Sequence, residues 1–143
     1  MLYYASIQKI KPNDYDGYIV FKVNKELLSF YYQAPIEFAD EYLLVGRSIV
    51  IDIWIELVSE IKELPDFSPY VPFGQYPADG DASGSVHSIL GPEQFRLDCG
   101  KLTFDVYLGR PVQFAPGTNL WVRGCRHVFF PNTEWSYEST GCV

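Results

Sequence analysis

Apolar residues alternate with other residues along much of this 143-residue chain, and this alternation strongly limits the folds that it can adopt. It is clearest in residues 48–57, SIVIDIWIEL, where isoleucine occupies every second position from 49 to 55. Successive side chains of a strand point to opposite faces, and β-branched residues suit a pleated surface better than a helix. This stretch therefore predicts a strand with an apolar face, and with Asp52, Trp54 and Glu56 on the opposite face.

Similar alternation recurs along the chain and predicts a mostly-β fold. GYIVFKV (17–23) and LLSFYY (27–32) flank a turn-like NKE, which is typical of a hairpin. QFRLD and LTFDVYL, joined by DCGK, predict a second hairpin. We expect a single compact β-barrel built largely from such hairpins.

One segment favours a helix instead. After Trp54, apolar residues recur at helical spacing at Leu57, Val58, Ile61 and Leu64, and Pro65 would end a helix there. The pattern predicts a strand to about residue 57, followed by one short helix near 58–64.

A Pro-, Gly- and aromatic-rich segment at 65–85 shows no periodicity, and a loop of that length is often functional or a linker. The segments on either side, 1–64 and 84–131, share one order: strand, tight turn, strand, irregular stretch, glycine and long strand. We expect a single domain over 1–143 whose halves form a pseudo-repeat. Two tandem small barrels are the alternative.

Residues 84–130, GSVHSILGPEQFRLDCGKLTFDVYL and then PGTNLWVRG, resemble the strand pattern of small OB-like Greek-key barrels. There a valine-containing first strand leads into a hairpin, and then into a strand of the form G-x-x-L/V-x-V-x-G. The resemblance implies a barrel. The nucleic-acid face of such barrels combines basic residues with stacking aromatics, and this chain has the aromatics without the charge.

The formal net charge of −7 also argues against a nucleic-acid ligand. Phosphate neutralisation requires a basic face, whereas the eleven Lys and Arg residues here are scattered. An acidic chain is better suited to solubility or to steering toward a basic partner. We therefore expect nucleic acid to be an unlikely ligand and a basic protein to be the partner.

Several absences favour a cytoplasmic protein. No apolar run approaches the roughly 20 residues of a membrane helix, and the first ten residues do not have the regions of a signal peptide. Cys99, Cys125 and Cys142 are odd in number, widely spaced and without a C-x-x-C pair. This pattern favours three reduced thiols over a disulfide scaffold or a structural zinc site, and we expect no cofactor.

A weak metal signal lies at Asp79, Asp81 and Ser83, in the order D-x-D-x-S-G. Alternate oxygen ligands before a glycine suit calcium. However, Leu90 occupies the position at which a calcium loop needs its glutamate, so a polar turn ending the long loop is the simpler interpretation.

Catalytic patterns are incomplete. Cys125 and His127 share a face of a predicted strand, whereas nucleophiles usually lie at turns or helix starts. Asp14 and Asp16 lie in PNDYDG, which is typical of a turn. We therefore expect no enzyme, with an unrecognised hydrolase as the remaining alternative.

The acidic and aromatic strip around Trp54 is the main functional candidate. A tryptophan that faces away from the core is either covered, here by the loop at 65–85, or anchors a partner. The expected partner-binding residues are Asp52, Trp54, Glu56, Tyr70, Phe73, Tyr76, Arg123, His127, Trp135 and Tyr137.

These residues lead to two function hypotheses. The first is a small acidic intracellular protein-binding module, an inhibitor or immunity-type protein that blocks a basic partner protein. The alternative is a small-molecule or carbohydrate-binding β-barrel that uses stacked aromatics. The exposed aromatic strips also leave a homodimer open.

Overall fold

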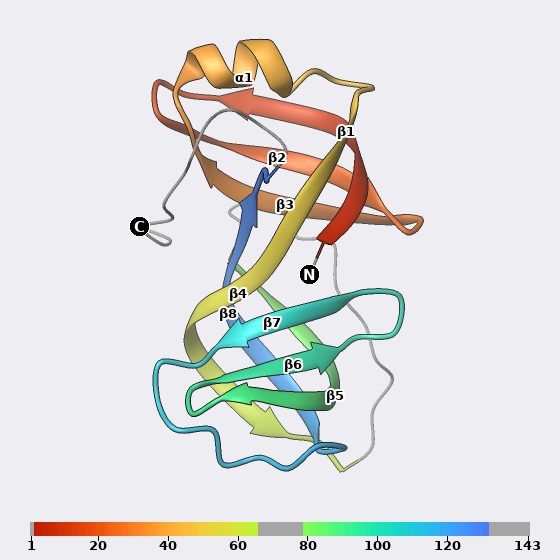
Figure 1. Cartoon of the computed structure of the whole chain (residues 1–143), viewed down its shortest axis with the longest axis vertical. Helices are drawn as coiled ribbons and strands as arrows, with labels where there is room; N and C mark the ends of the chain where they lie inside the picture. The colour runs from red at the N-terminus through yellow and green to blue at the C-terminus, as the bar shows by residue number, and fades with distance from the viewer. Residues whose placement is uncertain (1, 66–78, 132–143) are drawn as a thin grey trace.

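A computed structural model describes the backbone of residues 2–65 and 79–131, and the side chains of residues 2–65 and 81–131. Over these residues the fold is mostly β, as expected, with one short helix (Figure 1). The elements in chain order are β1 (Leu2–Pro12), β2 (Asp16–Val23), β3 (Glu26–Gln33), α1 (Ile36–Tyr42), β4 (Ser48–Glu63), β5 (Asp79–Gly91), β6 (Gln94–Asp98), β7 (Thr103–Tyr107) and β8 (Asn119–Phe129).

The strands form one sheet in the order β1-β2-β3-β8-β4-β7-β6-β5, with further pairings of β1 with β4 and of β8 with β5. Each further pairing closes a five-stranded ring: β1-β2-β3-β8-β4 in one and β4-β7-β6-β5-β8 in the other. The two rings lie one above the other in Figure 1, and β4 and β8 run through both. The expected barrel is therefore present as two closed rings that share two strands.

The isoleucine stripe of β4 faces the core, as its alternation predicts. Ile51, Ile53 and Ile55 are fully buried. Val128 on β8, the register partner of Ile53, is fully buried beside them, and Leu120 is fully buried farther along β8. Burying each such side chain stabilises the fold by about 1.5–3 kcal/mol.

Both predicted hairpins are confirmed. β2 and β3 pair antiparallel up to Val23 and Glu26, and the two turn residues, Asn24 and Lys25, have φ of 48° and 69°. Positive φ at both positions is the mark of a turn whose twist matches the flanking strands. β6 and β7 also pair antiparallel, from Gln94 with Tyr107 to Asp98 with Thr103, and the turn after Asp98 joins them.

The predicted helix near 58–64 is wrong, because β4 continues as a strand to Glu63. The register with β8 shifts between Glu56 and Glu60, and Leu57 has a φ of 52°. Such a bulge changes which residues share a face. Because the apolar alternation changes phase at the bulge, Leu57, Val58 and Ile61 follow a spacing in the sequence that resembles that of a helix.

The described helix lies earlier, at α1, directly after Pro35. Its residues Phe38 and Ala39 are buried, and the Phe38 ring lies 5.5 Å from that of Phe130. In Figure 1 it covers one end of the first ring. Within the described residues, no helix has the length and apolar character needed to cross a membrane.

The strand pairings on the two sides of the β4–β8 pair correspond to each other about its centre, where Trp54 lies opposite His127. On one side β1, β2 and β3 precede β4, and on the other β5, β6 and β7 precede β8. Correspondingly, β3 runs parallel to β8, and β7 runs parallel to β4. Each ring thus takes one strand from the other half of the chain. That 1–143 is a single domain with repeat halves 1–64 and 84–131 stays a prediction.

Candidate functional site

Trp54 and His127 lie together at the centre of the molecule. Their rings stack, with centroids 5.6 Å apart and an interplanar angle of 14°. Nε2 of His127 lies 3.1 Å from Oε1 of Glu56, the next outward residue along β4. Two of the residues predicted from the isoleucine stripe, Trp54 and Glu56, therefore meet a third that was predicted from β8.

Electrostatics at this cluster are set by burial. His127 is only 1% exposed, and burial lowers the pKa of its imidazole against the opposing effect of the Glu56 carboxylate. His127, which was expected to bind a partner, is therefore buried and not at the surface. A buried imidazole beside a half-buried carboxylate orients the Trp54 ring and is poorly placed to contact a partner directly.

Further acidic residues lie on the same face. Asp105 on β7 is the register partner of Trp54, so both point to one side of the sheet. Burial first, and then Asp105 and Asp52, raise the pKa of the Tyr107 hydroxyl. Trp54 thus lies among carboxylates on two strands, as its flanking residues predicted.

Arg123 does not join this cluster. Its guanidinium carbon lies 5.4 Å from the centre of the Trp121 ring, and the ammonium of Lys62 lies 5.2 Å from the same ring. Nε1 of Trp121 donates to Oδ2 of Asp81 at 2.8 Å. Arg123 is therefore part of a separate group on the second ring.

Arg126, the other arginine of this part of β8, is fully buried on the core side of the strand. Its Nη2 donates to the backbone oxygen of Asp81 at 3.0 Å, and burial lowers its pKa against the opposing effect of Asp81. Alternation on β8 would have identified it, since Arg126 shares a face with the core residue Val128.

The calcium candidates do not lie in a turn, because β5 begins at Asp79 and includes Asp81 and Ser83. A strand cannot wrap its oxygens around one ion as a calcium loop does. In the part of the chain with described side chains, no group of three or more His, Cys, Asp or Glu residues could hold a metal ion. The calcium site stays a prediction that this geometry does not favour.

The expectation of three reduced thiols is also wrong, because Cys125 is disulfide-bonded. Cys99 is free and buried, and burial raises the pKa of its thiol to about 12. Neither sulfur is therefore a thiolate nucleophile near neutral pH.

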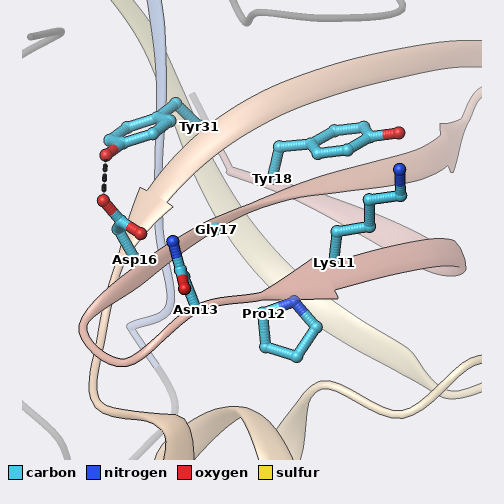
Figure 2. Close-up of a pocket in the computed structure, with 7 residues that line it drawn as sticks. All are labelled: Lys11, Pro12, Asn13, Asp16, Gly17, Tyr18 and Tyr31. Carbon is cyan, nitrogen blue, oxygen red and sulfur yellow. Dashed lines mark hydrogen bonds between the residues drawn. The ribbon is translucent and has the colours of Figure 1, made fainter.

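A pocket of about 560 Å³ lies where the β1–β2 turn meets β3 (Figure 2). Its lining residues are Lys11, Pro12, Asn13, Asp16, Gly17, Tyr18 and Tyr31. The hydroxyl of Tyr31 donates to Oδ2 of Asp16, and the Lys11 ammonium lies 6.0 Å from the centre of the Tyr18 ring. The pocket thus brings together a cation, a carboxylate, an amide and two tyrosines, of which Tyr18 is largely buried and Tyr31 is half-buried.

Gly17 makes the close packing of this pocket possible. A Cβ atom here would contact the Lys11 backbone oxygen and lie 2.7 Å from the Tyr32 hydroxyl. Tyr32 is buried, and its hydroxyl has no hydrogen-bond partner among the described residues. Burial, together with Asp16 and Asp40, raises its pKa, so the hydroxyl keeps its proton and remains a donor beside Gly17.

The pocket and the central cluster belong to one row of register partners. Tyr31 lies opposite Tyr18 on one side and opposite His127 on the other. Across the sheet the row consists of Lys11, Tyr18, Tyr31, His127, Trp54, Asp105 and Arg96. Four consecutive positions of this row carry rings, and neighbouring strands are about 4.8 Å apart.

The pocket residues were not predicted as a site. The sequence placed Asp14 and Asp16 in a turn, and the bend between β1 and β2 is indeed there. The nearby tyrosines and Lys11 were a usable signal, but their convergence depends on the β1–β2–β3 register. The predicted residues Tyr70, Phe73, Tyr76, Trp135 and Tyr137 lie outside the described residues.

Comparisons with known proteins identify a fold. No protein-family model matches the chain, and no curated protein matches its sequence. A solved structure of the cytoplasmic molybdate-binding protein ModG, with molybdate bound, has a TM-score of 0.55 at 14% identity. The match covers 92% of this chain and 96% of that chain. At this identity the match shows a common fold, which agrees with the OB-like barrels expected from residues 84–130.

Proposed function

We propose that this protein binds a small molecule, without catalysis, in the pocket between the β1–β2 turn and β3. The pocket itself carries the proposal. It encloses about 560 Å³, and Lys11, Asn13 and Asp16 converge there around two tyrosines. Small-molecule sites usually have such a volume, together with a few polar groups that orient the ligand.

The comparison supports binding over catalysis by analogy of fold alone. ModG is described as a molybdate-binding protein, and its structure is similar over nearly the whole chain. It is also described as cytoplasmic, which agrees with the location that we propose for this protein.

The alternative of an inhibitor that blocks a basic partner protein stays a prediction. Its central residue, Trp54, is half-buried and stacked on His127, so part of the expected anchor is already covered. No observation on the described residues favours that function over ligand binding.

The test is a thermal-shift screen of a chemically diverse small-molecule library. A ligand at 100 times its dissociation constant stabilises the folded state by about 2.7 kcal/mol. We expect at least one compound to raise the melting temperature of the wild type, and a Lys11→Met, Asn13→Ala double variant to lose the shift. Ser88→Ala is the matched control, since Ser88 pairs with Arg96 as Lys11 pairs with Tyr18.

Two results would contradict the proposal. One is a library in which no compound stabilises the wild type. The other is a set of stabilising compounds whose shifts are the same in the double variant and in the wild type.

A further inference from the structure

We infer that the ligand of this pocket is a neutral, hydroxyl-rich ring, that is, a sugar; the inference rests on the proposed function. It follows from the charges, the aromatic walls and the hydrogen-bonding groups of the pocket, and from the contrast with the corresponding positions of the second half.

The charges that line the pocket balance. Lys11 contributes one positive charge and Asp16 one negative charge. An oxyanion would have to lie near the Asp16 carboxylate in a chain of net charge −7, and like charges brought together are unfavourable. A cation would meet the Lys11 ammonium in the same way. A neutral ligand avoids both repulsions.

The aromatic walls suit a ring with many C–H groups. Tyr18 and Tyr31 are register partners on β2 and β3, so their side chains leave the same face of the sheet (Figure 2). The face of an aromatic ring carries partial negative charge and attracts the partly positive hydrogens of a C–H surface. Tyrosine adds a hydroxyl at the rim of such a wall.

The polar groups offer both hydrogen-bonding roles. Asp16 accepts from the Tyr31 hydroxyl and, as a carboxylate, has room for further donors. Lys11 donates, and the amide of Asn13 both donates and accepts. A hydroxyl group is at once a donor and an acceptor, so a polyol can use all three side chains. A simple oxyanion cannot use the Asp16 acceptor.

The second half does not repeat this combination. Where the first half has Tyr18 and Tyr31, the register places Arg96 and Asp105, which form an ion pair with Nε and Oδ1 2.8 Å apart. Each charge there is already neutralised by the other. Asp105 is therefore a carboxylate at the position equivalent to Tyr31, outside the pocket and already paired, and its replacement serves as the control for loss of a carboxylate charge elsewhere on the sheet.

The experiment titrates the wild-type protein, by protein-observed NMR, with two panels. The first contains glucose, galactose, N-acetylglucosamine, maltose and lactose. The second contains molybdate, phosphate and sulfate. We expect a sugar to shift the resonances of Asn13 and Gly17 saturably, and no oxyanion to do so.

Two carboxylate variants then decide the ligand class. Asp16→Asn removes a charged acceptor whose hydrogen bond is worth about 1.5–3 kcal/mol, so sugar binding should weaken about 10- to 100-fold. Asp105→Asn should leave sugar binding unchanged. For an oxyanion the expected effect is the opposite, because Asp16→Asn removes a like charge and would strengthen oxyanion binding. If Asp16→Asn fails to fold, as its NMR dispersion would reveal, Asn13→Ala on the exposed turn replaces it and should weaken sugar binding several-fold.

Failure of this inference is distinguishable from failure of the proposed function. Saturable oxyanion binding at Asn13 and Gly17 that is strengthened by Asp16→Asn would overturn the sugar and keep the pocket as a ligand site. The absence of sugar binding at these residues would likewise overturn the inference. The pocket itself would be overturned only by the two results of the thermal-shift screen given above: no stabilising compound, or shifts that the double variant leaves unchanged.

Discussion

The imidazole of His127 stacks on Trp54 and lies 3.1 Å from Glu56, yet its pKa is lowered by burial. Two effects oppose each other there. The carboxylate favours the protonated ring, and the loss of water favours the neutral ring. Burial has the larger effect, so the folded state holds the neutral imidazole.

This lowered pKa predicts acid-labile stability. An unfolded histidine has a pKa of about 6.5, so below that pH the unfolded state binds more protons than the folded state. The free energy of unfolding should therefore fall as the pH drops from about 6.5 toward the lower pKa of folded His127. Urea unfolding of the wild type and of His127→Gln across this range measures the effect, and the variant should have a shallower slope.

His87→Gln is the control for this prediction, because it removes a histidine at an exposed position of β5 and not a buried one. If the free energy of unfolding changes with pH equally in the wild type and in His127→Gln, buried His127 is not the cause of the loss of stability in acid.

Leu57 is a second residue whose local conformation affects stability, because its backbone is strained. Its φ of 52° lies in the left-handed region, which disfavours a side chain by about 1–2 kcal/mol, and the residue is 57% exposed. Leu57→Gly should therefore raise the free energy of unfolding by about 1 kcal/mol, as measured by urea denaturation. Ile89→Gly, at an exposed strand position of ordinary φ, should lower it instead. A loss of stability in both variants would contradict the expected backbone strain at Leu57.

At the scale of the element, the bulge in β4 and its partner Gly124 belong together. β4 passes from one ring to the other, and its register with β8 shifts between Glu56 and Glu60. A Cβ atom at Gly124 would lie 2.8 Å from the Glu56 backbone oxygen and 2.9 Å from Cγ2 of Ile55. Glycine at this position lets the two strands stay in contact across the bulge.

Gly124→Ala should therefore destabilise the fold by about 1–3 kcal/mol, the usual cost of an overpacked site. The control is Gly91→Ala, where a Cβ atom would meet nothing within 4 Å. Thermal and urea unfolding of both variants make the comparison. Equal stability of the two variants would mean that β8 moves away from β4 at little cost.

At the scale of the whole molecule, the two halves depend on each other. The first ring includes β8 from the second half, and the second ring includes β4 from the first half. Neither half can close its ring alone, and open sheet edges are unfavourable. We therefore expect the two halves to fold and unfold as a unit.

A protease site inserted between residues 66 and 78 tests this dependence. After cleavage the two fragments should remain associated in size-exclusion chromatography and separate only in denaturant, with one unfolding transition. The uncut protein is the control. Fragments that separate under native conditions would show that each half is independent and would favour two tandem barrels.

Much of the fold follows from local pattern. The isoleucine stripe predicted β4 and its buried face, and the two short turns predicted their hairpins, because period-2 burial and turn chemistry are local properties. The helix near 58–64 failed because a bulge at Leu57 changed the phase of the strand. The helix at Ile36–Tyr42 was missed because seven residues are too few to show helical periodicity.

The candidate site divides in the same way. Asp52, Trp54 and Glu56 share the outward face of β4, as their spacing required. The meeting of Trp54 with His127 could not be read from spacing, since 73 residues separate them and only the antiparallel register of β4 and β8 brings them together.

Alternation acts over neighbouring residues, so the amino-acid sequence was enough to predict a mostly-β fold with an apolar stripe on its longest strand. Three features came from the folded chain: two rings share β4 and β8, Arg126 and His127 are buried, and Lys11, Asp16 and Tyr31 line one pocket. Strand partners and register depend on contacts between distant segments, and one residue of slip would turn every side chain to the other face.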